Sequence, residues 1–138
     1  MLEIKDLCVS YGAIDAVKGI SLKVNDGEIV SLIGANGAGK TTTLRTITGL
    51  EKAASGSITF DGHDLRKTEP SKIITLKLAH VPEGRHVFPE LSVYENLVAG
   101  AIPCKKLPRA ELQNRIEQQF ELFPRLKERS SQMAGTMS

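Results

Sequence analysis

The first quarter of the chain alternates apolar and polar positions in the period of a β-strand. This alternation covers residues 2–4 and returns at residues 20–24, as expected for strands with one face in solvent. The Asn-Asp-Gly sequence at 25–27 is typical of a hairpin-type turn, because Asp-Gly tolerates the positive φ of a tight reversal. The opening segment therefore predicts an antiparallel β region.

The pattern then changes to a nearly continuous apolar run at residues 29–33. Such a run predicts a strand covered on both faces in a mainly parallel sheet. A glycine-rich loop follows, then a helix over residues 40–48 that ends at Gly49, and a strand over residues 57–60. Strand, glycine loop and helix in this order predict an α/β fold.

The second half of the chain predicts mainly helices. A further strand is expected at residues 79–81, before a loop at 82–85. Ser92 and Glu95 form a capping-box pattern, which predicts a helix over residues 93–99.

Apolar residues at helical spacing predict one more helix, from the first turn at Pro108 to just before Pro124. They are Leu112, Ile116, Phe120 and Phe123. The segment from Ser130 onward shows no pattern of its own. We therefore expect a core at residues 1–88 and a partial helical subdomain at residues 89–138.

Composition and charge exclude several classes of protein. The 138 residues carry 18 Lys plus Arg against 16 Asp plus Glu, and a net charge of +2 is too small to favour nucleic acid as the main partner. Apolar residues at 41% and charged residues at 25% are typical of a soluble globular protein. The longest uncharged stretch, residues 29–39, falls well short of the ~20 residues that cross a bilayer, and the N-terminal sequence does not resemble a signal peptide.

The cysteines and histidines do not indicate a metal centre. Cys8 and Cys104 have no second ligand at metal-binding spacing, and we expect reduced thiols of a cytoplasmic protein rather than one structural bridge. His63, His80 and His86 show no ligand spacing either. No His or Cys metal site is predicted.

Residues 34–41 match the phosphate-binding pattern G-x-x-x-x-G-K-[ST]. Glycines allow consecutive N–H groups to point inward and form a concave anion site at the positive end of the following helix. Lys40 can reach the β- and γ-phosphates, the Thr41 hydroxyl can bind Mg²⁺, and Thr42 can donate to the α-phosphate. The alternative is a plain glycine-rich turn before a helix. The loop residues expected to bind nucleotide are Gly34, Ala35, Asn36, Gly37, Ala38, Gly39, Lys40, Thr41 and Thr42.

The loop sequence GANGAGKTT resembles the Walker A motif of ATP-binding cassette (ABC) proteins. The agreement extends over essentially the whole chain, in the segments VSYG, SGSITFDG, VPEGRHVFPELSVYENL and ELFPRLKERSSQMAGTMS. Together these segments resemble the ATP-binding subunit of a branched-chain amino acid importer. The resemblance implies an ABC ATPase domain of the P-loop NTPase fold, with an N-terminal antiparallel β portion and the start of a helical subdomain.

The resemblance also implies roles for residues outside the loop. Tyr11 would stack on adenine, and Val17 would pack beside that base. Glu83 stands where most cassette ATPases carry the Q-loop Gln, so Mg²⁺ would be held by Thr41 and Glu83. The alternatives are ordinary packing for Tyr11 and a solvated loop acid for Glu83. The cluster of Arg85, His86 and Phe88 would lie near the surface that contacts the membrane subunits.

In the family, ATP lies between the Walker A loop of one subunit and the signature serine of a second subunit, which would be Ser138 here. The implied partners are ATP, a second ABC ATPase subunit and transmembrane permease subunits, at the cytoplasmic face of the inner membrane. The nearest approach to a Walker B strand, residues 58–61, is interrupted by Thr59 and runs into a turn at Gly62, and we do not assign it. We therefore expect a chain truncated before the signature motif that binds ATP without hydrolysing it.

Other classes remain open from the sequence alone. They are the ATPase subunit of another ABC transporter, including an exporter, another P-loop enzyme such as a nucleotide kinase or GTPase, and a non-catalytic nucleotide-binding or interaction module. Neither a guanine-specific acidic motif nor an Arg-rich lid, which would favour the kinase or GTPase, is visible.

Overall fold

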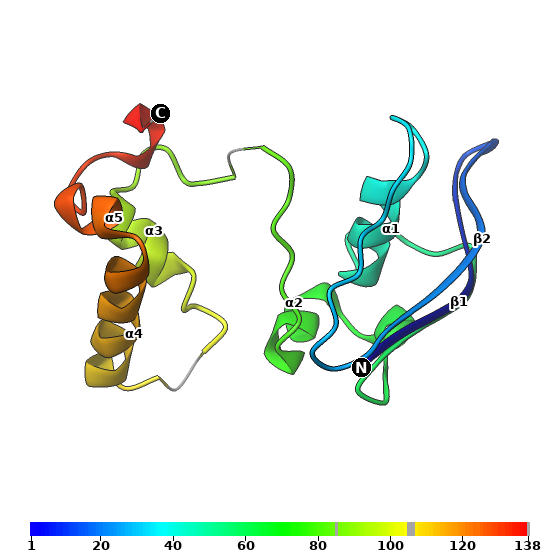
Figure 1. Cartoon of the computed structure of the whole chain (residues 1–138), viewed down its shortest axis with the longest axis horizontal. Helices are drawn as coiled ribbons and strands as arrows, with labels where there is room; N and C mark the ends of the chain where they lie inside the picture. Colours follow the sequence, from blue (N-terminus) through cyan, green and yellow to red (C-terminus); the bar gives the residue numbers. More distant parts are fainter. Residues whose placement is uncertain (85, 105–106, 138) are drawn as a thin grey trace. The chain divides into compact units, whose positions relative to one another are not determined.

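The computed structural model describes residues 1–84, 86–104 and 107–137 of the chain (Figure 1). The chain folds into two compact units, residues 1–80 and residues 81–138. Arg85 and Ser138, which carry expected roles at the coupling surface and in the signature motif, lie outside the described residues.

The first unit contains a four-stranded antiparallel sheet with strand order β2-β1-β3-β4. Its strands are β1 (Leu2–Tyr11), β2 (Ile14–Val24), β3 (Ser55–Phe60) and β4 (His63–Asp64). The predicted antiparallel opening is confirmed, although the tight turn that joins β1 to β2 lies at residues 12–13, where Gly12 has a φ of 60°. The predicted turn at 25–27 forms after β2 and does not join two paired strands.

A bulge in β1 places two large side chains in the core only three residues apart. Ile4 and Leu7 are both buried, which strict alternation along a strand does not allow. Asp6 between them has a φ of 46°, and the pairing of β1 with β2 shifts register there. The bulge turns the second half of β1 so that Leu7 and Val9 meet Val17 and Ile58 in the core.

The helices of the first unit are α1 (Lys40–Ile47) and α2 (Pro70–Ile73), with the short 3-10 turns η1 (Leu65–Lys67) and η2 (Ile74–Leu76). The helix predicted over residues 40–48 is confirmed. The strands predicted at 29–33 and 79–81 are wrong, because no described segment offers either of them a hydrogen-bonding partner. Ile29, Ile33 and Val81 are therefore more than 90% exposed.

The second unit consists of α3 (Val93–Ala99), α4 (Arg109–Leu122), α5 (Pro124–Glu128) and the 3-10 turn η3 (Ala134–Thr136). The capping box and the helix over residues 93–99 are confirmed. Ile116 and Phe120 on α4 are buried as predicted, whereas Phe123 lies beyond the end of this helix and is 57% exposed. The sequence did not predict α5 or η3.

Both cysteines are free, as expected. Among the described residues, no helix has the length and apolar character that crossing a membrane requires.

Candidate nucleotide-binding site

The glycine loop leads directly into α1 and leaves the N-terminus of this helix open. Gly39 is the N-cap residue, and no side chain in the described part of the chain caps the helix. The N–H and the hydroxyl of Thr43 both donate to the Gly39 carbonyl oxygen at 2.8 Å, which fixes the first turn. The first N–H groups of a helix have no partner inside it, so the end of α1 presents free donors and a positive dipole end.

The loop packs against the backbone of β2 at Gly39. This residue is buried and has a φ of 84°, and a Cβ atom on it would lie 2.5 Å from the Ala16 carbonyl oxygen and 3.0 Å from Val17 Cγ2. The structure therefore brings the predicted residues Val17 and Gly39 together. Val17 is only 4% exposed and contributes to the core as well.

Lys40 folds back over the loop that precedes it. Its Nζ atom donates to the carbonyl oxygens of Gly34 and Ala35, both at 2.7 Å. Because the side chain is only half-buried and neither acceptor is charged, a phosphate can replace these carbonyls as the partner of the ammonium group. The cation thus already lies over the loop.

Two threonine hydroxyls at the start of α1 remain available to a ligand. The hydroxyls of Thr43, Thr46 and Thr48 donate to the carbonyl oxygen four residues earlier. Within the described residues, the hydroxyls of Thr41 and Thr42 form no such bond. A free hydroxyl beside an anion site fits Mg²⁺, which takes few ligands from the protein and completes its shell with phosphate oxygens and water.

A cavity of about 470 Å³ lies beside the loop. Val17, Ile20, Leu32 and Ile33 form its apolar lining, and Asp15, Lys18, Lys40 and Thr43 form its polar lining. The sequence did not single out Asp15 and Lys18, whose only signal was their position next to Val17. The Asp15 carboxylate accepts a 2.8 Å hydrogen bond from the Ser10 hydroxyl.

Of the predicted residues, Val17, Gly37, Ala38 and Lys40 line this cavity, and the two that lie farthest from the loop in sequence, Tyr11 and Glu83, do not. Tyr11 ends β1 and is 45% exposed, opposite Ile14 in the hairpin. Glu83 belongs to the second unit, where its side chain is exposed and its carbonyl oxygen lies 2.7 Å from His86 Nε2. The pairing of Thr41 with Glu83 as magnesium ligands spans the two units and stays a prediction. No group of three or more His, Cys, Asp or Glu side chains in the described parts of the chain could hold a metal ion.

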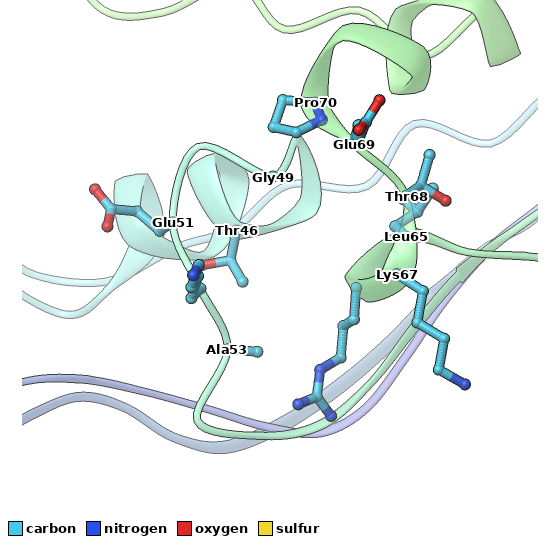
Figure 2. A pocket seen from close by; sticks show the side chains of 11 residues that line it. Thr46, Gly49, Glu51, Ala53, Leu65, Lys67, Thr68, Glu69 and Pro70 are labelled. Atoms are coloured by element: carbon cyan, nitrogen blue, oxygen red, sulfur yellow. The ribbon is translucent and has the colours of Figure 1, made fainter.

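A second pocket of the first unit, of about 500 Å³, lies at the C-terminal end of α1. Figure 2 shows Thr46 and Ala53 on one side of it and Leu65 and Thr68 on the other. Three of its charged residues, Glu51, Lys67 and Glu69, form ion pairs of 3.0 to 3.3 Å with neighbouring residues. None of the predicted phosphate-binding residues lines this pocket, and we assign it no ligand.

A loop of sequence G-x-x-x-x-G-K-[ST] that leads into an open helix end is typical of P-loop nucleotide-binding domains. Residues 17–138 match the profile of the ABC transporter family. The chain is 48% identical over its full length to the high-affinity branched-chain amino acid transport ATP-binding protein BraG of Pseudomonas aeruginosa, and it covers 58% of that protein. It is also 39% identical over 116 residues to the spermidine/putrescine import ATP-binding protein PotA of Legionella pneumophila, with 84% of this chain and 31% of that protein covered.

Solved structures agree with this assignment. The ATP binding subunit of an ABC transporter superimposes with a TM-score of 0.86 at 34% identity, over 100% of this chain and 56% of that one. An ATP-binding cassette in its ADP conformation gives a TM-score of 0.76 at 27% identity, over 100% of this chain and 59% of that one. The chain belongs to the ABC transporter family and has the ABC ATPase fold, as the sequence predicted. It spans little more than half the length of BraG and of these structures.

Proposed function

We propose that the chain belongs to an ATP-binding subunit that energises import of the branched-chain amino acids Leu, Ile and Val by an ABC transporter. One observation carries the nucleotide-binding claim: the glycine loop lies against β2 with the Lys40 ammonium over it and the end of α1 open. Backbone N–H donors and a fixed cation form an anion site suited to a triphosphate. The substrate class is supported by the similarity to BraG over the full chain.

The proposed cofactors are ATP and Mg²⁺. The nine residues from Gly34 to Thr42 would hold the phosphates, Tyr11 and Val17 would contact adenine, and Thr41 and Glu83 would bind the metal. When bound, Mg²⁺ would neutralise charge between the β- and γ-phosphates.

The proposed partners are a second ABC ATPase subunit and the permease subunits of the transporter, at the cytoplasmic face of the inner membrane. Val87 and Phe88 are 48% and 60% exposed, and we propose that this apolar loop contacts a permease subunit. The proposal on partners rests on the names of the relatives, which describe transport and import.

We further propose that the 138-residue chain binds ATP without hydrolysing it. Hydrolysis needs a group that orients the attacking water, in addition to a phosphate cradle. Among the described residues, Asp15 is the carboxylate that lines the cavity beside the loop, and the Ser10 hydroxyl already donates to it.

Calorimetry with Mg-ATP tests the binding claim. Wild type should release heat on binding, and Lys40→Ala should weaken binding by about 1.5–3 kcal/mol, roughly 10- to 150-fold, because an ammonium–phosphate contact is lost. Lys23→Ala is the matched control, since Lys23 is exposed on β2 and does not line the cavity. A folded wild-type chain without heat of binding would refute the proposal, and steady phosphate release abolished by Lys40→Ala would refute the claim of inactivity.

Import of another solute is the second candidate. It is favoured by the 39% identity to a spermidine/putrescine import protein and by 36% identity to an sn-glycerol-3-phosphate import protein of Rhizobium etli. Transport assays of the whole subunit with its permease, using leucine, putrescine and glycerol-3-phosphate, would decide between these substrates.

A further inference from the structure

A single side chain of the second unit holds the loop before α3 at both of its ends. The amide nitrogen of Asn96 donates to the carbonyl oxygens of Phe88 at 3.0 Å, Leu91 at 3.2 Å and Ser92 at 2.9 Å. Its Oδ1 atom accepts from the Phe88 N–H at 2.8 Å. Both ends of the amide group are therefore used, and the backbone from Phe88 to Ser92 is fixed to α3.

The same loop also holds the segment that precedes Ser138. The N–H of Ala134 donates to the Leu91 carbonyl at 2.9 Å, and the N–H of Gly135 donates to the Pro89 carbonyl at 3.1 Å. The Leu91 carbonyl oxygen thus accepts one hydrogen bond from the Asn96 side chain and one from the Ala134 N–H. Through this oxygen, α3 and segment 134–136 share a bonding partner in the loop.

Close packing reinforces these hydrogen bonds. A Cβ atom on Gly135 would lie 2.8 Å from Pro89 Cβ, so only glycine allows this approach. Val87 and Phe88 also line an apolar cavity of about 710 Å³, together with Asn96 and Ala134. An exposed aromatic side chain and the segment 134–136 are therefore connected through the loop that Asn96 fixes to α3.

We propose that Asn96 is a positioning residue that couples the Phe88 loop to segment 134–136. This inference rests on the proposed function, in which a permease subunit contacts the Phe88 loop and a second ABC ATPase subunit is the partner of the chain. A contiguous hydrogen-bonded network transmits displacement only while its links hold. Without the Asn96 amide donations, the loop would lose its fixed position on α3, and its backbone bonds to Ala134 and Gly135 would hold segment 134–136 less firmly.

The first experiment measures amide hydrogen exchange in the 138-residue chain. Asn96→Asp keeps the size of the side chain and its acceptor for the Phe88 N–H, but it loses the amide donors. We expect exchange at the Ala134 and Gly135 amides to rise about five-fold or more. Tyr94→Phe is the matched control on α3, because it removes only the hydrogen bond from the Tyr94 hydroxyl to Gln113 of α4 and leaves the Asn96 bonds intact. Unchanged exchange in a folded Asn96→Asp chain would overturn the inference.

The second experiment uses the whole subunit assembled with its permease in vesicles, and it measures leucine transported per ATP hydrolysed. With Asn96→Asp we expect an unchanged Kd for ATP and a ratio lowered about five-fold or more. A proportional loss of transport and hydrolysis would show a merely structural role and overturn the inference. If Asn96→Asp does not fold, Gly135→Ala replaces it as the test variant. A Cβ atom on residue 135 would push segment 134–136 away from Pro89, and we expect the same ratio to fall. A wild-type assembly without leucine transport would refute the proposed substrate, while the exchange measurement would still decide the link.

Discussion

Gly39 and Ala16 approach so closely that the first can only be glycine. A Cβ atom on Gly39 would lie 2.5 Å from the Ala16 carbonyl oxygen, well inside contact distance. Gly39 also has a φ of 84°, a conformation that costs a residue with a Cβ atom about 1–2 kcal/mol. The phosphate-binding loop therefore depends on a contact with a strand that lies more than twenty residues earlier in the sequence.

This contact predicts the effect of substituting two glycines of the loop. Gly39→Ala should lower the free energy of unfolding by the conformational penalty and by about 1–3 kcal/mol more, because the new Cβ atom clashes with β2. Gly37 has the same φ of 84°, but a Cβ atom on it would have no neighbouring atom within 4 Å, so Gly37→Ala should incur the conformational penalty alone. Urea unfolding of both variants measures the difference.

Nucleotide binding gives a second readout of the same pair. The displaced loop of Gly39→Ala should lose affinity for Mg-ATP, since its N–H groups no longer converge. Equal stability and equal affinity of the two alanine variants would show that the approach to Ala16 does not position the loop.

Tyr11 offers a test of the proposed adenine contact. Tyr11→Ala should weaken ATP binding by about 1 kcal/mol, roughly five-fold, because an aromatic stacking surface is lost. Binding of inorganic triphosphate should not change, since the phosphates contact the glycine loop. Tyr11→Phe keeps the ring and serves as the control. If the alanine variant binds both ligands as wild type does, Tyr11 is an ordinary packing residue.

The features predicted correctly from the sequence depend on local chemistry. The helix over residues 93–99 was found because Ser92 and Glu95 cap it within one turn, and the glycine loop was found because its backbone conformation requires glycines. The run at 29–33 has the composition of a buried strand, but a strand exists only when another segment pairs with it. No described segment does so here.

At the candidate site, too, local chemistry could be predicted from the sequence and contacts between distant segments could not. The chemistry of Lys40 and Thr41 follows from their place in the loop, whereas the Ala16 carbonyl and the Asn96 amide act on segments that only the fold brings near. The role of Pro124 is ambiguous in the sequence, because proline is found both after the end of a helix and in the first turn of the next one. Pro124 was interpreted as the stop of one helix, and it is also the first residue of α5, a position that proline favours.

The capping box predicts a pH dependence of stability. The Ser92 N–H and the Ser92 hydroxyl donate to the Glu95 carboxylate and hold its pKa below the ordinary value. A carboxyl group whose pKa is lowered by folding stabilises the protein above its ordinary pKa, and this stability is lost as the pH falls through the lowered pKa. The midpoint of thermal unfolding should therefore decrease on acidification through this window.

Glu95→Gln isolates the contribution of this group, because glutamine keeps an acceptor oxygen and does not titrate. Its unfolding midpoint should decline less steeply than that of wild type between about pH 6 and about pH 3. Far-UV circular dichroism of the whole chain follows the unfolding transition. Parallel curves for the two proteins would show that the Glu95 charge does not contribute.

The exposed run at residues 29–33 predicts self-association of the chain. Ile29 is 98% exposed, and no described segment pairs with the backbone of this run, so it offers both an apolar surface and free hydrogen-bonding groups to a second copy. Size-exclusion chromatography with light scattering should show a mass that rises with concentration, and Ile29→Lys should lower it because a charge opposes strand pairing. Ile102→Lys is the matched control, since Ile102 is 73% exposed but stands outside the run. A wild-type chain that stays monomeric at every concentration would show that the run does not associate.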